Sequence, residues 1–146
     1  MLQLRRAVPD DLAQLLPRIL ALNAHEGITM PPPRVEAALE RLLSDPHLGG
    51  AWLVERGGAA IGYAIVTFGY DLEFAGRDAF LTDLWIDPEA RGAGAGAAAL
   101  ALLEPTVRAL GVHALHLAVR PENPARRLYE RSGFVASPRV LMTRTL

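Results

Sequence analysis

Two reactive side chains are absent from this sequence, and each absence removes a class of chemistry. The 146 residues contain no cysteine, which excludes disulfide bonds, thiolate metal sites and a cysteinyl intermediate. They also contain no lysine, because all fifteen basic residues are arginine. A phosphate loop of the Walker type needs its lysine on the terminal phosphates, and a Schiff base needs a lysine amine. The sequence therefore excludes both of these mechanisms.

Long apolar runs and strong charge are absent as well. Asp, Glu or Arg interrupts every apolar run before it reaches the length of a membrane span, and Arg5 and Arg6 argue against a signal peptide. The net charge is −1 and no basic stretch occurs, which argues against a nucleic-acid partner. Apolar residues make up 51% of the chain and charged residues 21%. We therefore expect one globular, cytoplasmic domain over residues 1–146, with no membrane or nucleic-acid partner.

The pattern of apolar residues predicts an α/β (α+β) fold, in which a mixed sheet carries helices on its faces. Helical periodicity is found at residues 9–24, 34–44, 96–110 and 121–131. Strands are predicted at 2–6, 51–56, 59–68, 79–86 and 112–119, with one or two more at 134–146. Gly57-Gly58 separates two of these strands, and this dipeptide favours a tight hairpin.

A glycine-rich loop, Arg91-Gly92-Ala93-Gly94-Ala95-Gly96, lies between a predicted strand and a long predicted helix. Glycine lets backbone N–H groups approach an anion closely, a helix N-terminus favours negative charge, and Arg91 adds a positive charge. A flexible turn without a ligand is the alternative. A dinucleotide fold requires G-x-G-x-x-G, whereas this loop has G-x-G-x-G and follows a hairpin. The loop alone indicates a phosphate site and leaves its ligand open.

Two blocks of the sequence resemble one enzyme family. The stretch from Leu84 to Gly96 resembles the acetyl-CoA signature of the GNAT N-acetyltransferases, which is Arg/Gln-x-x-Gly-x-Gly/Ala after a central strand. The stretch from Asn123 to Phe134 is similar to the Asn-x-x-Ala/Arg-x-x-Tyr-Glu-x-x-Gly-Phe ending of these enzymes. The order of elements also matches, so the resemblance covers nearly the whole chain. It implies a GNAT fold with about four helices and a mostly antiparallel sheet of six to seven strands, and an acetyl-CoA-dependent N-acetyltransferase.

The resemblance also assigns roles to residues. It places Tyr129 beside the cofactor sulfur as general acid, because a phenol with a pKa of about 10 keeps its proton at neutral pH. A tyrosine packed against the sheet is the alternative. Asn123 contacts the cofactor or orders its loop, and a helix N-cap is compatible with either. The cofactor-binding positions that the resemblance implies are Leu84, Trp85, Ile86, Arg91, Gly92, Ala93, Gly94, Ala95, Gly96, Asn123 and Arg126.

Acyl transfer also needs a proton acceptor, because a primary amine with a pKa of about 10.4 is protonated at pH 7. Asp83 lies on the strand ahead of the cofactor-binding residues, where family members commonly carry an acid facing the acceptor. It is predicted to be the base and to bind the substrate, and an exposed strand carboxylate is the alternative. Glu26, after the first helix, is predicted to bind the amine. Three acidic residues of the connection at 69–78 are further candidates for a negative cleft, unless they form a solvated loop face: Asp71, Glu73 and Asp78.

The acceptor is the least determined part of the sequence. The stretch from Tyr70 to Leu84 looks like the diamine and thialysine acetyltransferase branch, whose strand carries a Glu-Asp pair. Here the pair is Thr82-Asp83, which removes a carboxylate often assigned as the base. A small-molecule primary amine is the first expectation, and a protein or peptide amine is the second. A non-catalytic acyl-CoA sensor is the third. The resemblance further implies a homodimer, and no residue pattern predicts a metal site.

Overall fold

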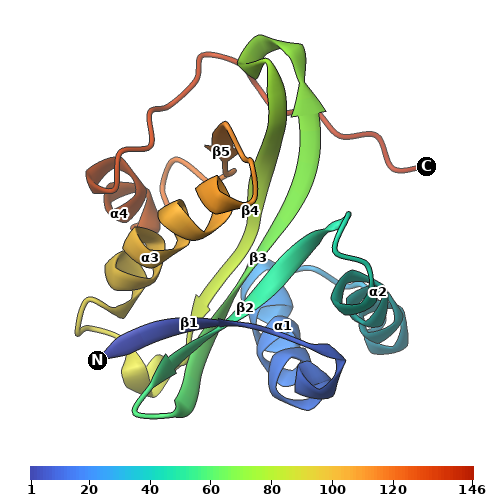
Figure 1. The fold of residues 1–146 in the computed structure, drawn as a ribbon, viewed down its shortest axis with the longest axis vertical. Coiled ribbons are helices and arrows are strands. Elements are labelled where there is room, and N and C mark those ends of the chain that lie inside the picture. The colour runs from blue at the N-terminus through green and yellow to red at the C-terminus, as the bar shows by residue number, and fades with distance from the viewer.

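The computed structural model describes residues 1–146. Five strands form one sheet in the order β1-β2-β3-β4-β5: β1 (Leu2–Arg6), β2 (Gly49–Arg56), β3 (Ala59–Asp71), β4 (Gly76–Ile86) and β5 (Ala114–His116). Four α-helices accompany the sheet: α1 (Leu12–Glu26), α2 (Pro32–Ser44), α3 (Ala95–Ala109) and α4 (Ala125–Arg131). This mixed architecture confirms the predicted fold class (Figure 1). None of the helices has the length and apolar character that crossing a membrane requires.

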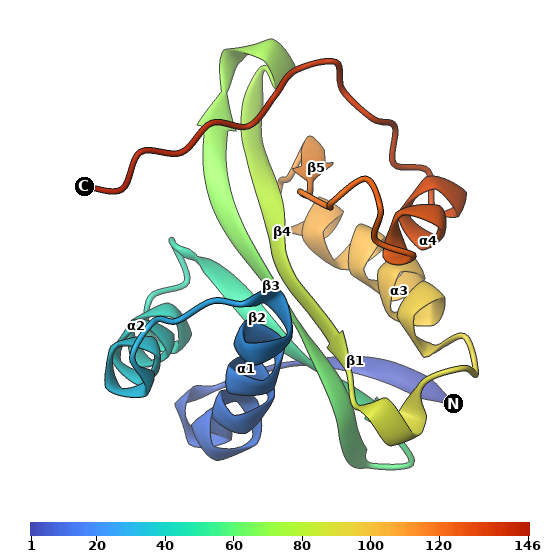
Figure 2. The same cartoon turned by 180° about the vertical axis from the view of Figure 1, so that it is seen from behind.

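Helices cover both faces of the sheet (Figures 1 and 2). On one face, α1 and α2 bury an apolar cluster against β2 and β3, which includes Leu15, Ile19, Leu39, Leu53, Tyr63 and Ile65. On the other face, α3 buries a second cluster, which includes Trp52, Val66, Leu81, Leu100, Leu103 and Val107. The three α3 residues of this cluster recur every three to four positions, so that they form one apolar stripe along the helix. The core therefore lies in two layers, one on each side of the sheet.

The first four strands pair antiparallel with their neighbours, and β4 pairs parallel with β5. Gly57 and Gly58 connect β2 to β3 with φ angles of 60° and 81°. Two-residue hairpin turns of this kind need positive φ at both central positions, which glycine adopts without steric cost. The tight hairpin that the sequence predicts at this dipeptide is confirmed.

A β-bulge in β4 decides which way its side chains point. The register between β3 and β4 shifts between Ile65 and Val66, and Thr82 is the extra residue on β4. Ahead of the bulge odd-numbered residues of β4 pack toward α3, and beyond it even-numbered residues do: Ala79, Leu81, Leu84 and Ile86. Because successive strand residues alternate between faces, the bulge turns Asp83 toward the face that α1 covers.

Two expectations about the last third of the chain are wrong. The strand expected at 112–119 is limited to Ala114–His116, and residues 134–146 form no strand. The sheet consequently has five strands where six to seven were expected. Residues 140–146 include one Val and two Thr, which favour strands. A strand also needs a partner edge, however, and sequence propensity does not supply one.

Candidate active site

The strands β4 and β5 diverge and leave a cleft between them. β5 pairs with β4 only at Asp78, Ala79 and Phe80. Farther along, residues 81–84 of β4 and residues 117–120 form opposite walls of a cleft of about 470 Å³. Because β5 does not pair with this stretch of β4, the strand presents unpaired backbone N–H and C=O groups to the cleft.

Five residues predicted from separate parts of the sequence line this cleft. Glu26 ends α1, Asp83 and Leu84 lie on β4, Asn123 precedes α4, and Tyr129 lies on α4. The fold thus brings together the predicted acid, the predicted base and the predicted amine-binding residue. Their convergence depends on the pairing of β3 with β4 and on the packing of α4. Both are contacts between distant segments, so a local sequence pattern does not predict them.

Other predicted residues lie beside the cleft or farther away. Trp85 and Ile86 continue β4 beyond its lining, and residues 91–96 follow as the entry to α3. Arg126 lines a second, larger cavity between α3 and α4, and its Nε lies 3.3 Å from Oε1 of Glu130. The predicted catalytic residue Asp83 and the predicted phosphate loop are therefore separated by the end of β4 and by the short 3-10 turn at Pro88–Ala90.

Asp83 is held by a buried tyrosine. The Tyr63 hydroxyl on β3 donates a hydrogen bond of 2.7 Å to Oδ2 of Asp83, and Tyr63 has no exposed surface. Burial raises the pKa of the Asp83 carboxyl above its usual range, while hydrogen bonds from Tyr63 and Thr82 oppose that rise. Burial, and next the charge of Asp83, raise the pKa of Tyr63, so that its hydroxyl stays protonated. A carboxylate with a raised pKa accepts a proton more readily.

Tyr63 was not among the residues that the sequence predicted for the site. The available signal was its hydroxyl, because a tyrosine within a buried strand needs a hydrogen-bond partner. That partner lies twenty positions away, and the bulge at Thr82 is what turns it toward Tyr63. The hydrogen bond between Tyr63 and Asp83 can be predicted only when the register of β3 against β4 is known.

Tyr129 is a partly buried phenol that keeps its proton at neutral pH. Burial raises the pKa of its phenol above the usual 10.0, and the charge of Glu26 raises it further. Its ring meets Phe134 edge-on, with 6.0 Å between the centroids, and packs on the core beneath α3. Tyr129 therefore packs against the core, as the alternative expectation had it, and also lines the cleft; the acid role stays a prediction.

Asn123 orders the chain where it enters α4. Its Oδ1 accepts a hydrogen bond of 2.9 Å from the Ala125 backbone N–H, and its backbone carbonyl accepts one of 3.0 Å from Arg126. This is the loop-ordering contact that was one of the two roles expected of Asn123. A contact with a cofactor stays a prediction.

The glycine loop leads into α3 through two left-handed glycines. Gly92 and Gly94 have φ angles of 84° and 77°, a conformation that glycine adopts readily. The Gly94 carbonyl accepts the first hydrogen bond of the helix, from Ala98 at 3.0 Å. The N–H groups of the first turn consequently have no partner within the helix, which is the condition for binding an anion there.

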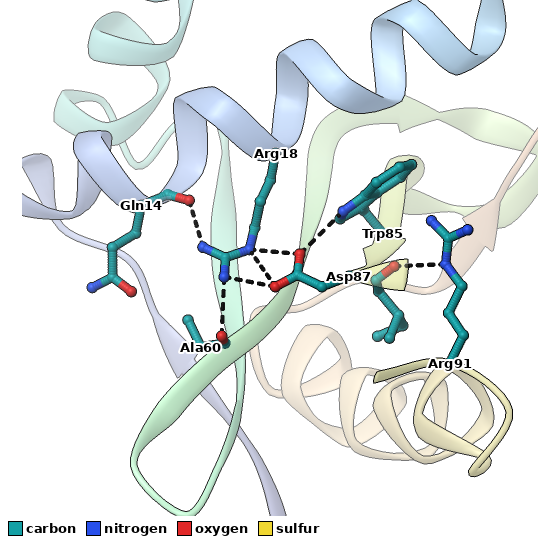
Figure 3. A network of polar contacts seen from close by, with 7 residues as sticks. Gln14, Arg18, Ala60, Trp85, Asp87 and Arg91 are labelled. Carbon is teal, nitrogen blue, oxygen red and sulfur yellow. Dashed lines mark hydrogen bonds and ion pairs between the residues drawn. The ribbon is translucent and has the colours of Figure 1, made fainter. Parts of the chain in front are cut away.

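Arg91 folds back onto the end of β4 (Figure 3). Its Nε donates a hydrogen bond of 2.8 Å to the Ile86 carbonyl, and its guanidinium lies 4.5 Å from the centre of the Trp85 ring. In this position the arginine braces the glycine loop against the strand that precedes it.

A partly buried ion pair joins α1 to the end of β4 (Figure 3). Nη2 of Arg18 lies 2.8 Å from Oδ2 of Asp87, with side chains 20% and 15% exposed, and it also donates to the Ala60 carbonyl at 3.0 Å. The Trp85 indole N–H donates to Oδ1 of Asp87 at 3.2 Å. This network, which the sequence did not predict, sets the point where the chain leaves the sheet for the glycine loop.

We expect Arg18→Met to lower the free energy of unfolding by about 2 kcal/mol, because it leaves a partly buried carboxylate without its cation. Full burial would make the loss larger, and the residual exposure of the pair reduces it. The midpoint of urea denaturation measures the change. The matched control is Arg34→Met on the exposed start of α2, for which the shift should stay within about 0.5 kcal/mol. Equal midpoints for both variants would contradict a stabilising role for the pair.

The carboxylates of the acidic connection lie away from the cleft. Oδ2 of Asp78 is 3.0 Å from Nε2 of His116, and Oε2 of Glu73 is 2.9 Å from Nη1 of Arg139. Asp71 accepts a hydrogen bond from the Glu73 backbone N–H. None of the three lines the cleft, so they do not supply the negative lining considered for them. No group of three or more His, Asp or Glu residues is placed to hold a metal ion.

Similarity to known proteins extends over nearly the whole chain. An integron cassette protein from the mobile metagenome of Cole Harbour Salt Marsh is 33% identical with a TM-score of 0.86, over 99% of this chain and 90% of that one. A candidate acetyltransferase from Arthrobacter sp. FB24 is 29% identical with a TM-score of 0.82, over 99% and 96%. A predicted acetyltransferase from Clostridium acetobutylicum, solved with acetyl-CoA, shares the fold at 20% identity and a TM-score of 0.81, over 99% and 96%.

The sequence model of one family includes the elements that form the cleft. It matches residues 17–134, a range that contains most of α1, all of β4 and the glycine loop, and α4 with Tyr129. Among curated protein sequences, none matches this chain. The family match covers well over half of the sequence, and the similar solved structures share the fold. The protein belongs to the acetyltransferase (GNAT) family and is an acyltransferase enzyme.

Proposed function

We propose that the enzyme transfers the acetyl group of acetyl-CoA directly to a primary amine of a small cationic molecule, in the cleft between β4 and the segment after β5. The observation that carries this proposal is that Glu26, Asp83 and Tyr129 line one cleft. Acetyl transfer to an amine requires an amine-binding group, a proton acceptor and a proton donor. These three side chains correspond to the three requirements.

The residues around the cleft fit acetyl-CoA as a substrate. Leu84, Trp85 and Ile86 continue β4 beyond the stretch that pairs with β5, and they are the positions where the resemblance places backbone groups for the pantetheine arm. The free N–H groups at the start of α3 suit the pyrophosphate, and Gly92 and Gly94 place no Cβ between the backbone and its oxygens. Two polar residues at the entry to α4 complete the proposed binding set, Asn123 and Arg126. Acetyl-CoA supplies the activated thioester.

The chain's own residues handle the two protons of the reaction. Asp83, oriented by Tyr63, accepts the proton that the ammonium must lose before its nitrogen attacks the thioester carbon. As the new C–N bond forms and the C–S bond breaks, Tyr129 donates its phenolic proton to the leaving sulfur, and the second proton that the attacking nitrogen loses restores the Tyr129 phenol. Thr82 carries no acid in this scheme; as the bulge residue it aims Asp83.

The dimensions and charge of the cleft support a small cationic acceptor. A volume of about 470 Å³ is in the range of small-molecule sites. Its two carboxylates, Glu26 and Asp83, outnumber the one arginine of its lining, Arg120, and attract an ammonium group. Diamines and thialysine are the first acceptors to test, because the sequence around Tyr70 to Leu84 resembles that branch. We further infer a cytoplasmic homodimer, on the resemblance alone.

Thiol release with a panel of amines tests the proposal. Because the chain contains no cysteine, a thiol-reactive chromophore reports only the CoA that the reaction liberates. The panel contains diamines, thialysine, amino acids, aminoglycosides and peptide N-termini. Acceleration by small cationic amines supports the proposal, and acceleration by peptides alone favours a protein acceptor. CoA binding with no acceleration by any amine would identify a sensor and overturn the proposed catalysis.

We expect Glu26→Gln to raise KM for a cationic amine about tenfold, which corresponds to about 1.4 kcal/mol of lost attraction. Its kcat at neutral pH should change little, because Glu26 takes no proton in the scheme. Loss of its charge should also lower the pKa of Tyr129, since that charge raises it. Steady-state kinetics with the best amine measure both effects. Glu40→Gln on the exposed side of α2 is the control, and an equal KM for both variants would contradict amine binding by Glu26.

A further inference from the structure

One basic side chain lies in the cleft, and the proposed proton transfers do not use it. Arg120 is the only basic residue of the cleft lining. Most arginines of this chain hold a carboxylate or a carbonyl oxygen, whereas the Arg120 guanidinium has no polar partner within the chain. A guanidinium that faces a cleft without such a partner is available to an anionic group of a ligand.

The backbone of Arg120 is fixed on both sides. Residues 117–119 precede it in the wall of the cleft, and Pro121 follows, which disfavours helical conformations at the residue before it. The Arg120 carbonyl accepts a hydrogen bond of 2.9 Å from the Asn123 backbone N–H. The Asn123 side chain in turn accepts one from Ala125, the first residue of α4. The turn into α4 therefore holds the root of the side chain, while the residue itself stays exposed to a ligand.

The charged side chains of the cleft form a pattern. Asp83 lies on β4, and Arg120 ends the segment that forms the opposite wall. Glu26 lines the same cleft from the end of α1. Two carboxylates and one guanidinium thus surround a space of about 470 Å³. A ligand with two ammonium groups and one anionic group complements these charges, and such a ligand is still a cation overall.

A carboxylate suits this arginine better than a phosphate does. The planar guanidinium binds a carboxylate through two parallel N–H···O hydrogen bonds. A phosphate monoester carries a second negative charge, which a single arginine would leave uncompensated in a cleft that also holds Glu26 and Asp83. The phosphates of acetyl-CoA have their own proposed site at the start of α3, beyond the end of β4. The anionic group expected at Arg120 is therefore a carboxylate of the acceptor.

We propose that Arg120 binds a carboxylate of the acceptor, and that the acceptor is a diamino acid. One amine meets Asp83 and is acetylated, the second amine pairs with Glu26, and the carboxylate pairs with Arg120. Arg120 determines specificity in this arrangement and takes no part in the proton transfers. The inference rests on the proposed function, because it specifies the acceptor of that reaction. It adds the expectation that removing the carboxylate from a diamino acid makes it a poorer acceptor.

Pairs of acceptors that differ only in the carboxylate test the proposal: lysine with cadaverine, and ornithine with putrescine. Because the carboxylate also changes the amine pKa, the measured quantity is the ratio of kcat/KM within a pair, compared between wild type and variant. We expect Arg120→Gln to lower the preference for the diamino acid about tenfold, the effect of a charged hydrogen bond at a partly exposed site. Arg120→Glu should lower it further, and KM for acetyl-CoA should stay unchanged in both variants. Arg56→Gln removes the same charge from the exposed end of β2 and should keep the wild-type preference.

Binding measurements separate this inference from the proposed function. Isothermal titration calorimetry of the same pairs in the presence of CoA needs no turnover. Tighter binding of the diamino acid that Arg120→Gln abolishes, without thiol release, would support the role of Arg120 and overturn the proposed catalysis. Thiol release whose preference within each pair is the same in wild type and in both Arg120 variants would overturn the role of Arg120 and support the catalysis. A raised KM for acetyl-CoA with an unchanged preference would place Arg120 on the cofactor and also overturn the inference.

Discussion

Asp83→Asn is expected to lower kcat/KM for acetyl transfer by about 10²- to 10⁴-fold at neutral pH, the range of effects that positioned acids and bases have. Asparagine keeps the shape of the side chain but accepts no proton, so the reaction depends on amine that arrives neutral. Neutral amine becomes more abundant as pH approaches the amine pKa of about 10.4. The defect should therefore shrink steadily as pH rises, and thiol release measured from neutral pH upward records that trend.

Tyr63→Phe keeps the Asp83 carboxylate and removes the hydrogen bond that orients it. It therefore tests the hydrogen bond separately from the carboxylate. The hydrogen bond from Tyr63 lowers the pKa of Asp83, so its removal should raise that pKa. Because the base acts when deprotonated, the acid limb of the rate profile should move to higher pH, with a smaller loss of the plateau rate than in Asp83→Asn. Asp78→Asn, on the same strand but outside the cleft, is the matched carboxylate control. A defect of Asp83→Asn that does not change with pH would contradict the role of Asp83 as base.

Tyr129→Phe is the second large effect, and we expect it to lower kcat by about 10²- to 10⁴-fold. The substitution retains the ring that packs against Phe134 and removes only the proton donor, so the CoA sulfur leaves as a thiolate. A more acidic thiol leaves without the help of an acid. The loss should therefore be much smaller with an acetyl thioester of an aromatic thiol, provided that this donor binds.

The pH profile gives an independent test of the same residue. Tyr129 acts while protonated, so the wild-type rate should fall as pH rises through its phenol pKa, which lies above 10.0 because burial and Glu26 raise it. In Tyr129→Phe this basic limb should disappear. Tyr70→Phe, whose ring is 76% exposed at the hairpin tip, is the control. If Tyr129→Phe matches that control in kcat with both donors, Tyr129 is a packing residue and the acid lies elsewhere.

Local patterns in the sequence determined the family and much of the fold. The turn at Gly57-Gly58 and the apolar stripe of α3 depend on residues a few positions apart, and those interactions are readable without a structure. The glycine loop before α3 and the block around Asn123 and Tyr129 led to the GNAT family in the same way. The elimination of lysine and cysteine chemistry required composition alone.

The arrangement of the site was decided by contacts between distant residues. The bulge at Thr82 turns Asp83 toward Tyr63, twenty positions away, and the ion pair of Arg18 with Asp87 spans 69 positions. Strand register and the placement of α4 arise from packing across the sheet, so no local sequence pattern predicts them. The C-terminal residues show that composition alone also overpredicts structure. Residues 140–146 contain residue types that favour strands, but they form no strand, because strand pairing depends on an available edge. The sequence by itself determined the family and the candidate residues of the site, because both depend on local motifs. Only the tertiary structure decided which of these candidates line one cleft, because that depends on packing between distant segments.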